Sequence, residues 1–174
     1  MFSDPTYNIE QFGISSDDVV ADFGAGSGFY SLAVAKKATS GKVYAVDIQD
    51  DLLRKLSTEA RARKCTNVET IRADLGMPGS TRLREGSVSK VIVASILIQM
   101  DAVAREQALK EAFRILRKGG SMLVIEWFPG SGVGPKPEMC IHPEVLKKLL
   151  VQIGFQVARD IDAGAYHYGF VCNK

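Results

Sequence analysis

The chain has 174 residues, of which 46% are hydrophobic, and 22 lysines and arginines against 20 aspartates and glutamates leave a net charge of +2. This length and composition predict a single globular domain over residues 1–174. The basic residues are scattered among acidic ones, which disfavours a nucleic-acid-binding surface. The longest strongly apolar run, Val91–Ile98, is far below the roughly 18 residues that a membrane span needs.

The N-terminus and the cysteines predict a cytoplasmic protein. The first residues, MFSDPTYNIE, have neither the basic start nor the apolar core of a secretory signal. Cys65, Cys140 and Cys172 are widely spaced and form no CxxC pair, so the sequence indicates neither a zinc site nor redox chemistry. We therefore expect free thiols, a reducing compartment and no bound metal.

Short apolar and β-branched runs alternate with segments of helical spacing. The predicted strands are Val19–Phe23, Lys42–Asp47, Val68–Arg72, Lys90–Ala94 and Ser121–Trp127. The predicted helices are Phe29–Ala38, Asp50–Lys64, Val103–Leu116, ending in the basic sequence RKGG, and a segment at about Pro143–Ile153. Between the third and fourth strands, DLGMPGSTRLREGS contains too many turn residues for a full helix.

This βα repeat predicts an α/β fold, with a doubly wound, Rossmann-like sheet and helices on both faces. Several strands are apolar on both sides, as parallel strands covered by helices are. The chain ends with two strand-like runs, FQVARDIDAG and AYHYGFVCNK, joined by a short turn. We therefore expect five parallel strands and a C-terminal hairpin that gives one antiparallel strand.

The first strand leads into a glycine-rich turn, in the sequence VVADFGAGSGFYSLAVA. Open α/β sheets bind ligands beyond the C-terminal ends of their strands, usually at the first βα turn. Gly24, Gly26 and Gly28 allow a sharp turn and close approach of a ligand, and the helix that follows offers free N–H donors. A tight turn without a ligand contains the same glycines, so the pattern alone is a weak signal.

Three features narrow the ligand. The dinucleotide fingerprint G-x-G-x-x-G/A needs a small residue where this chain has Phe29, which disfavours nicotinamide and flavin cofactors. Asp22 would repel a pyrophosphate but suits a cationic ligand with one carboxylate. Asp47 ends the second strand nineteen residues after Gly28, where a carboxylate accepts both hydroxyls of a ribose. An adenosine with an amino-acid tail, S-adenosylmethionine, satisfies all three.

Over nearly its whole length the sequence resembles the class I, seven-stranded, Rossmann-like methyltransferases. The likeness rests on DFGAGSG, the acid of VDI, RADL, the fourth strand VIVASI, and LRKGGSMLVIEW leading into the fifth strand. It implies an enzyme that uses S-adenosylmethionine and transfers its methyl group to a small-molecule acceptor by in-line displacement.

The resemblance also implies roles for single residues. Asp22 and the Gly24–Gly28 backbone would hold the methionine part of the cofactor, with Ser95 beneath it. Asp47 would hold the ribose, and Asp74 with the residue after it the adenine edge. The predicted cofactor-binding residues are Asp22, Gly24, Ala25, Gly26, Gly28, Asp47, Ile48, Asp74, Leu75 and Ser95.

The C-terminal part is loosely similar to the ubiquinone and menaquinone C-methyltransferases. This likeness rests on the loop FPGSGVGPKPEMCIHPE and on YHYG near the C-terminus. The chain has about a dozen residues before Gly13 and no inserted substrate domain. We therefore expect residues 1–12 and the loop 128–141 to cover the pocket as a lid, and we expect the loop to be mobile and to order with substrate or a partner.

Methyl transfer depends mainly on alignment and exclusion of water, and it needs a general base only where the acceptor must lose a proton. No metal is required, and no catalytic residue stands out. The candidates are Glu126, His142 and His167, although His142 precedes Pro143 and equally fits a helix start. Candidates for contact with the acceptor are Tyr7, Gln99, Trp127 and Tyr166.

Two other functions stay open. The chain could be a non-catalytic subunit that binds S-adenosylmethionine or activates a partner, because the cofactor motif does not reveal an acceptor site. It could also methylate a macromolecule, although the N-P-P-Y and Pro-Cys signatures of nucleic-acid methylation are absent from the sequence. A nicotinamide-dependent dehydrogenase is disfavoured by Phe29 and Asp22.

Overall fold

A computed structural model describes residues 3–174, so residues 1–2 of the predicted N-terminal cover lie outside the described residues. The strands are β1 (Val19–Phe23), β2 (Lys42–Asp47), β3 (Val68–Arg72), β4 (Val88–Ala94), β5 (Leu116–Trp127), β6 (Gln156–Ile161) and β7 (His167–Asn173). The helices are α1 (Pro5–Phe12), α2 (Phe29–Lys37), α3 (Asp50–Ala62), α4 (Ala102–Ile115) and α5 (Pro143–Ile153), with short 3-10 helices η1 (Leu97–Gln99) and η2 (Pro137–Met139).

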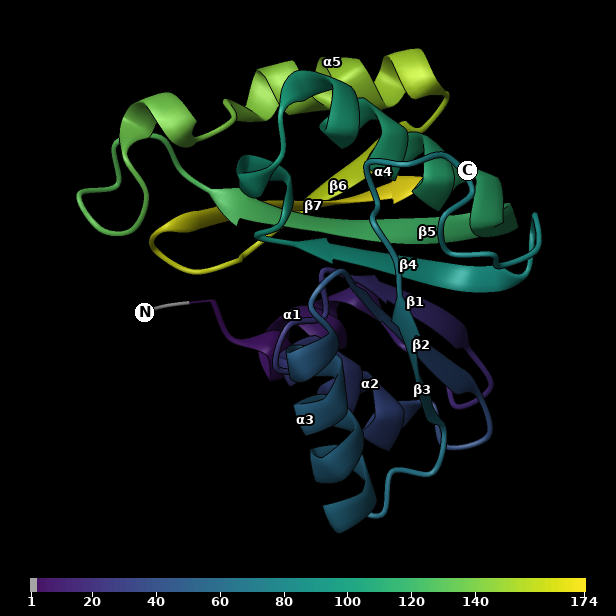
Figure 1. The fold of residues 1–174 in the computed structure, drawn as a ribbon. Helices are drawn as coiled ribbons and strands as arrows, with labels where there is room; N and C mark the ends of the chain where they lie inside the picture. The colour runs from purple at the N-terminus through teal and green to yellow at the C-terminus, as the bar shows by residue number, and fades with distance from the viewer. Residues whose placement is uncertain (1–2) are drawn as a thin grey trace.

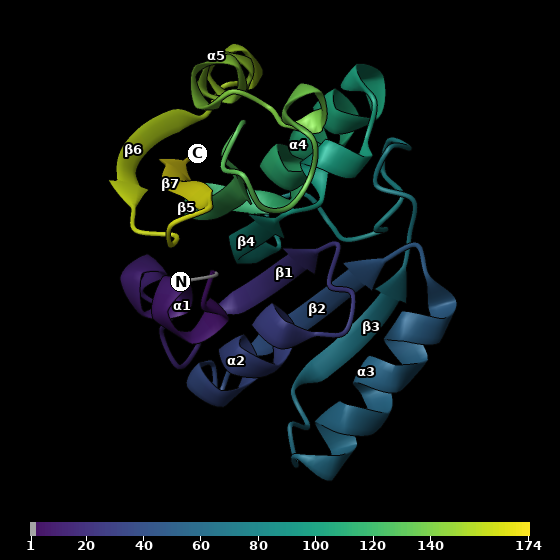
Figure 2. The same ribbon diagram turned by 90° about the vertical axis from the view of Figure 1, so that its left-hand side faces the viewer.

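Within residues 3–174, seven strands form one sheet in the order β3-β2-β1-β4-β5-β7-β6. Strands β1 to β5 run parallel, and β7 is antiparallel to both of its neighbours, β5 and β6. The predicted α/β sheet with a C-terminal hairpin is therefore confirmed. Figure 2 shows the C-terminal arrowheads of β1, β2 and β3 pointing to the same side. The chain order reverses between β1 and β4, which is where open sheets of this kind bind ligands.

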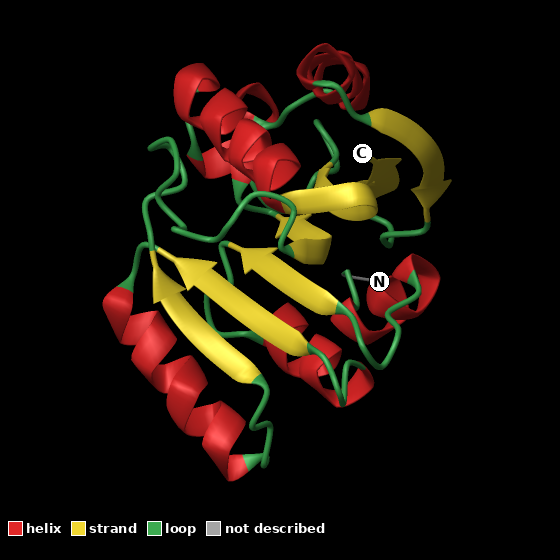
Figure 3. Ribbon diagram, turned by 90° about the vertical axis from the view of Figure 1, so that its right-hand side faces the viewer, coloured by secondary structure: helices red, strands yellow, loops and turns green. Residues whose placement is uncertain are grey.

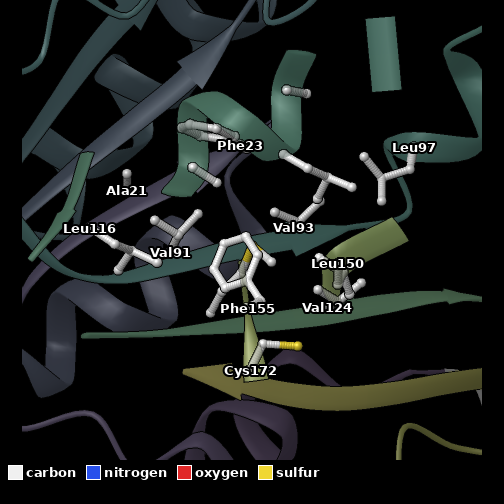
Figure 4. Close-up of a cluster of buried hydrophobic side chains, with 14 of the residues drawn as sticks. Ala21, Phe23, Val91, Val93, Leu97, Leu116, Val124, Leu150, Phe155 and Cys172 are labelled. Carbon is white, nitrogen blue, oxygen red and sulfur yellow. The ribbon is translucent and has the colours of Figure 1, made fainter. Parts of the chain in front are cut away.

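Helices cover both faces of the sheet (Figures 1 and 3). On one face, α1 and α2 bury Ile9, Phe12 and Val34 against Ile92 and Leu123 of the sheet, and α3 packs beside α2. On the other face, α4 and α5 pack on the opposite side chains of the same strands. Figure 4 shows part of this second core, with Ala21, Phe23, Val91, Val93, Leu97, Leu116, Val124, Leu150, Phe155 and Cys172 labelled. The sheet is rigidly held on both sides, so its C-terminal edge can position a site.

The junction of α4 and β5 differs from the prediction. Helix α4 ends at Ile115 and β5 begins at Leu116, so the sequence RKGG belongs to the strand and is not the last turn of the helix. The Nζ of Lys174 donates to the carbonyl oxygens of Phe113 and Leu116 at 2.6 and 2.8 Å. The side chain of Lys174 therefore provides a hydrogen-bond donor for carbonyl groups at the end of α4, in place of the glycine cap that the local sequence suggested.

Helix α1 is an addition to the predicted elements. Asp4 accepts hydrogen bonds from the amides of Thr6 and Tyr7 at 2.8 and 3.4 Å, Pro5 occupies the first helical position, and Gly13 ends the helix with φ 76°. These are ordinary helix start and stop signals, and they were readable in the sequence. The helix lies against α2, which brings the N-terminal segment next to the glycine turn.

None of the helices in the described part of the chain combines the length and apolarity that a membrane span requires. The connection between β3 and β4 contains turns and no α-helix within residues 73–87, as its composition predicts. The three cysteines are free.

Candidate cofactor site

The site is built on the turn between β1 and α2, which is fastened to the neighbouring strand β2. The amides of Gly24 and Ala25 both donate to the carbonyl oxygen of Val46, at 2.8 and 3.0 Å. Gly24, Gly26 and Gly28 have φ values of 72°, 53° and 86°, in the left-handed region that glycine adopts without strain. The alternate glycines therefore give the turn its shape.

The three glycines have different surroundings. A Cβ at Gly24 would lie 2.7 Å from the side chain of Ile96, and a Cβ at Gly28 would lie 2.1 Å from Leu56. Packing within the protein therefore excludes side chains at these two positions. A Cβ at Gly26 would have no neighbour nearer than 3.9 Å and would project into open space. Gly26 is thus the glycine whose missing side chain leaves room for a ligand.

Asp47 joins the end of β2 to the glycine turn. Its side chain accepts hydrogen bonds from the amide of Gly26 to Oδ2 at 2.8 Å and from the amide of Gln49 to Oδ1 at 2.9 Å. An ionised carboxylate has about four acceptor positions, so two stay available for a ligand's hydroxyls. Asp47 both fixes the turn and offers acceptors at the place expected for a ribose.

Asp22, the last acid before the glycines, is buried at the C-terminal end of β1. Its Oδ2 accepts a hydrogen bond from the hydroxyl of Ser31 on α2 at 2.6 Å. Burial raises the pKa of Asp22 from 3.8 to about 6, and the charge of Asp47 adds to the increase, although the hydrogen bonds from Ser31 oppose it. A positive charge placed beside Asp22 would restore its ionised form.

Two cavities that share Gly24 lie at this edge of the sheet, with volumes of about 340 and 290 Å³. The first is lined by Gly24, Asp47, Ile48, Gln49, Ala73, Asp74, Leu75, Ile96, Gln99, Met100, Asp101 and Ala104. The second is lined by Ser3, Pro5, Asp22, Gly24, Ala25, Gly26, Ser27, Phe29, Tyr30, Ala94 and Ser95. Nine of the ten predicted cofactor-binding residues line one of them, and the tenth, Gly28, packs against Leu56.

The lining of the two cavities is acidic. Asp22, Asp47, Asp74 and Asp101 contribute to it, and among residues 3–174 no lysine or arginine does. Opposite charges attract strongly at short range in a partly buried site, and like charges repel. The arrangement suits a ligand that is cationic and has no phosphate, and it opposes a pyrophosphate.

The turn after β4 supplies a wall of which the sequence predicted Ser95 and Gln99 but not Ile96 and Met100. Ser95 begins it with a left-handed φ of 54° and donates its amide to the carbonyl oxygen of Ile125 at 2.8 Å. Such a backbone is strained for a residue other than glycine and is often found at functional sites. Ile96 and Met100 then line the first cavity. No local pattern marks them, because the wall exists only once β4 and β5 are paired.

The candidate acceptor-contact residues are dispersed. Gln99 lines the first cavity, next to the cofactor-binding residues. Tyr7 is 48% exposed on α1 and lines neither cavity. The ring of Trp127 contacts that of His167 at a tilt of 41°, with 4.1 Å between centroids, and Tyr166 lies just before β7, where its carbonyl oxygen accepts from the amide of Phe128. The structure brings Gln99 alone of these four to the two cavities.

The catalytic candidates have three unrelated environments. His142 caps α5, where its Nδ1 accepts from the amide of Glu144 at 3.4 Å, the helix-start role that its sequence position allows. Glu126 is fully buried and accepts from the amide of Leu97 at 2.8 Å. His167 is 6% exposed, its Nδ1 has no hydrogen-bond partner in the described part of the chain, and burial lowers its pKa. None of the three lines either cavity.

Metal-dependent chemistry has no obvious ligand set here. Among residues 3–174, no group of three or more His, Cys, Asp or Glu side chains is arranged to hold a metal ion. The acids of the cavities lie at separate strand ends and turns, and all four already accept hydrogen bonds from the protein.

Comparison with known proteins gives a family match. A family model described as a methyltransferase domain matches residues 20–120, which include β1 to β4, the glycine turn and the start of β5. The match therefore contains every residue that lines the first cavity.

Solved structures share the fold over almost the whole chain. A SAM dependent methyltransferase from Aquifex aeolicus is 24% identical with a TM-score of 0.87, and the similarity covers 98% of this chain and 89% of that one. A SAM-dependent methyltransferase from Methanosarcina mazei is 18% identical with a TM-score of 0.76, covering 97% of each chain. The [4+2]-cyclase SpnF is 15% identical with a TM-score of 0.82, covering 98% of this chain and 80% of that one.

Proposed function

The chain belongs to the methyltransferase-domain family and is an S-adenosylmethionine-dependent methyltransferase domain, and from this we propose that it methylates a small-molecule acceptor by in-line displacement. The observation that carries the proposal is the acidic pair of cavities around Gly24, whose described lining contains four aspartates and no lysine or arginine. A sulfonium cofactor with an amino group and no phosphate is complementary to such a lining.

We propose that Asp47 orients the ribose and Asp74 with Leu75 holds the adenine in the first cavity. Asp22 and the turn at Gly26 would face the methionine part in the second cavity. When bound, the cofactor supplies a methyl carbon already activated by its sulfonium. The residues named here would then align that carbon and exclude water, and alignment of this kind accounts for much of the rate of a displacement.

The covering elements complete the proposal. The loop 128–141 contains Gly130, Gly132 and Gly134, all with left-handed φ values between 75° and 88°. Gly134 lies directly on the ring of Trp127, because a Cβ there would approach it to 2.4 Å. Helix α1 lies beside the second cavity, which Pro5 lines. We propose that α1 and this loop form the lid over the acceptor, in a cytoplasmic enzyme.

The lid proposal predicts slower amide exchange on ligand binding. Amides of residues 128–141 should exchange more slowly when S-adenosylhomocysteine and the acceptor, or an acceptor analogue, are both bound, because opening of the loop then costs more. Hydrogen–deuterium exchange with mass spectrometry measures this, and α5 serves as the internal control. Equal exchange of the loop with and without ligands would contradict the lid.

Asp22 predicts a pH dependence of cofactor binding. The protonated amino group of the cofactor, which S-adenosylhomocysteine keeps although it lacks the sulfonium, favours the ionised carboxylate, and the pKa of Asp22 in the free protein is raised to about 6. Affinity should therefore be full above that pH and fall below it, by at most about tenfold per pH unit. Calorimetric titration with S-adenosylhomocysteine from pH 5 to 8 measures the profile, and Asp22→Asn should flatten it near pH 6. A pH profile in Asp22→Asn that equals that of the wild-type protein would contradict a role for Asp22 in cofactor binding.

Transfer of a labelled methyl group tests the function itself. Radiolabelled S-adenosylmethionine should label at least one acceptor in a panel of apolar and aromatic hydroxyl, amine, thiol and quinone-like compounds. The sequence resemblance to quinone C-methyltransferases, which the comparisons do not show, makes quinol-type acceptors the first to try. Label that appears only in protein or nucleic acid fractions would indicate that the acceptor is a macromolecule and not a small molecule.

A second function has one observation in its favour. None of the three candidate bases lines a cofactor cavity, so a chain that binds S-adenosylmethionine and serves a partner is consistent with the geometry. SpnF, with the same fold, is described as a cyclase, and fold alone does not fix a reaction. Tight binding of S-adenosylhomocysteine without methyl transfer across the whole panel would favour this alternative.

A further inference from the structure

The turn after β4 is held by groups that the cofactor motif does not include. Residues Ile96 to Met100 form this turn, and its side chains Ile96, Gln99 and Met100 line the first cavity. Ile96 also lies over Gly24, where a Cβ would approach it to 2.7 Å. If the turn moved, both the wall of the cavity and the cover of the glycine turn would move with it.

Two side chains of opposite charge bind the backbone of this turn. Glu126 on β5 accepts a hydrogen bond from the amide of Leu97 to its Oε1 at 2.8 Å. Arg105 on α4 donates from Nε to the carbonyl oxygen of Leu97 at 3.2 Å and from Nη2 to that of Met100 at 3.1 Å. The carboxylate of Glu126 therefore accepts a hydrogen bond from one backbone amide of the turn, and the guanidinium of Arg105 donates hydrogen bonds to two backbone carbonyls of the same turn. Hydrogen bonds to charged groups are the stronger kind.

Glu126 is placed where its ionisation matters. It is fully buried, and its Oε2 has no hydrogen-bond partner among residues 3–174. Burial raises the pKa of Glu126 from 4.5 to about 7, while hydrogen bonds from backbone amides, including that of Leu97, and the charge of Arg105 act in the opposite direction. Among the described residues Oε2 lacks a partner in either protonation state, but the ionised carboxylate accepts more strongly from the amide of Leu97, so protonation weakens its hold on the turn.

The ionisable groups around Glu126 do not titrate in the same range. Burial raises the pKa of Tyr168 on β7 and of Cys140 before α5, so both are neutral near pH 7. Arg105 on α4 stays positively charged. A change between pH 6 and 8 at this turn therefore reports Glu126, whereas Asp22 changes nearer pH 6 and lies at the second cavity.

We propose that Glu126 is a positioning residue for the cofactor, acting with Arg105 as a charged clasp that holds the turn after β4 against the adenosine end of the site. The inference rests on the proposed function, because it assigns the first cavity to the adenosine. Glu126 touches neither cavity and acts through Leu97. It thereby gives the site a second dependence on pH, with tighter binding when Glu126 is ionised.

Calorimetry with S-adenosylhomocysteine tests the clasp in four variants. Glu126→Gln keeps the shape and an acceptor oxygen but removes the charge, and it should weaken binding by about tenfold at pH 8 while abolishing the change between pH 6.5 and 8. Arg105→Met should weaken binding to a similar degree, and the double variant should lose less than the two single losses combined, because both act on one turn. Glu111→Gln is the control. Glu111 is buried like Glu126, but it lies on α4 and its hydrogen-bond partners are Arg114 and Thr81.

A second measurement in the wild-type protein covers the case in which the variants fold poorly. The amide resonance of Leu97 should shift with pH around 7, because its acceptor oxygen belongs to the group that titrates. A Leu97 resonance that stays constant from pH 5.5 to 8.5, or a Glu126→Gln variant with wild-type affinity and pH profile, would overturn the clasp. Loss of affinity equal to that of Glu111→Gln would do the same. Absence of any binding to wild-type protein would instead contradict the proposed function.

Discussion

Asp47→Ala should weaken binding of S-adenosylhomocysteine by about 2–4 kcal/mol, the largest loss expected from a single side-chain truncation in the site. The carboxylate would accept charge-assisted hydrogen bonds from the ribose hydroxyls. It also accepts from the amides of Gly26 and Gln49, so its removal loosens the glycine turn as well. The first effect removes contacts to the ligand and the second leaves the turn less well ordered for binding, so both lower the affinity.

Two controls separate the roles of Asp47. Asp47→Asn keeps one acceptor oxygen and should lose less, near the lower end of that range. Asp50→Ala removes an acid three residues further on, whose partner is Arg54 on the surface of α3, and it should leave affinity unchanged. Calorimetric affinities for the three variants, with thermal unfolding to confirm the fold, measure the difference. Wild-type affinity in Asp47→Ala would refute the ribose role.

Gly26→Val should abolish detectable cofactor binding, a weakening of more than about a hundredfold or 2.7 kcal/mol. The added side chain would project into open space within the protein, since a Cβ there has no neighbour nearer than 3.9 Å. It would therefore meet the ligand. The valine would also strain the backbone, because φ is 53°, at a cost to stability of about 1–2 kcal/mol.

Gly119→Val isolates the steric effect from the strain. Gly119 has φ 72° and no atom within 4 Å of its Cβ position, so a valine there carries similar strain in similar open space. It lies in the irregularity of β5 between the paired residues Leu116 and Ser121, and Trp127 is at the other end of that strand. Both variants should lose similar stability in thermal unfolding, and Gly26→Val alone should lose affinity. Equal affinities would place the ligand elsewhere.

The parts of the account that the sequence predicted well are those that depend on neighbouring residues. The strands at Val19–Phe23 and Lys42–Asp47 have the predicted bounds, because their apolar runs end at turn residues. The cavity residues Asp22 and Asp47 lie at the C-terminal ends of these strands and Gly26 just after one of them, and parallel strands bring such ends together. The topology therefore converts local patterns into one site.

The features that the sequence did not predict depend on contacts distant in the chain. The start of β5 at Leu116 is stabilised by Lys174, 58 residues away. The hydrogen bond from Leu97 to Glu126 joins residues 29 positions apart, so neither residue looks unusual in its own segment. Helix α1 is the exception, because Asp4, Pro5 and Gly13 are local signals.

The residues that would contact the methyl acceptor are the part of the site that could not be predicted from the sequence. Cofactor residues come from strand ends and are near one another in every sheet of this order, whereas the acceptor would meet the loop 128–141, α1 and the start of β7. Gln99 lies beside the cofactor cavities, but Trp127 and His167 pair with each other under that loop. Identification of the acceptor therefore requires methyl transfer measurements rather than further comparison of folds.

Calorimetry that compares S-adenosylhomocysteine with NAD tests the central claim most directly. The acidic cavities around Asp22 and Asp47 predict binding of S-adenosylhomocysteine and no detectable binding of NAD, whose pyrophosphate the carboxylates repel. At pH 7.5, above the pKa of about 6 that burial gives Asp22, the Asp22 carboxylate is ionised and the contrast is largest. Binding of NAD without binding of S-adenosylhomocysteine would contradict the account.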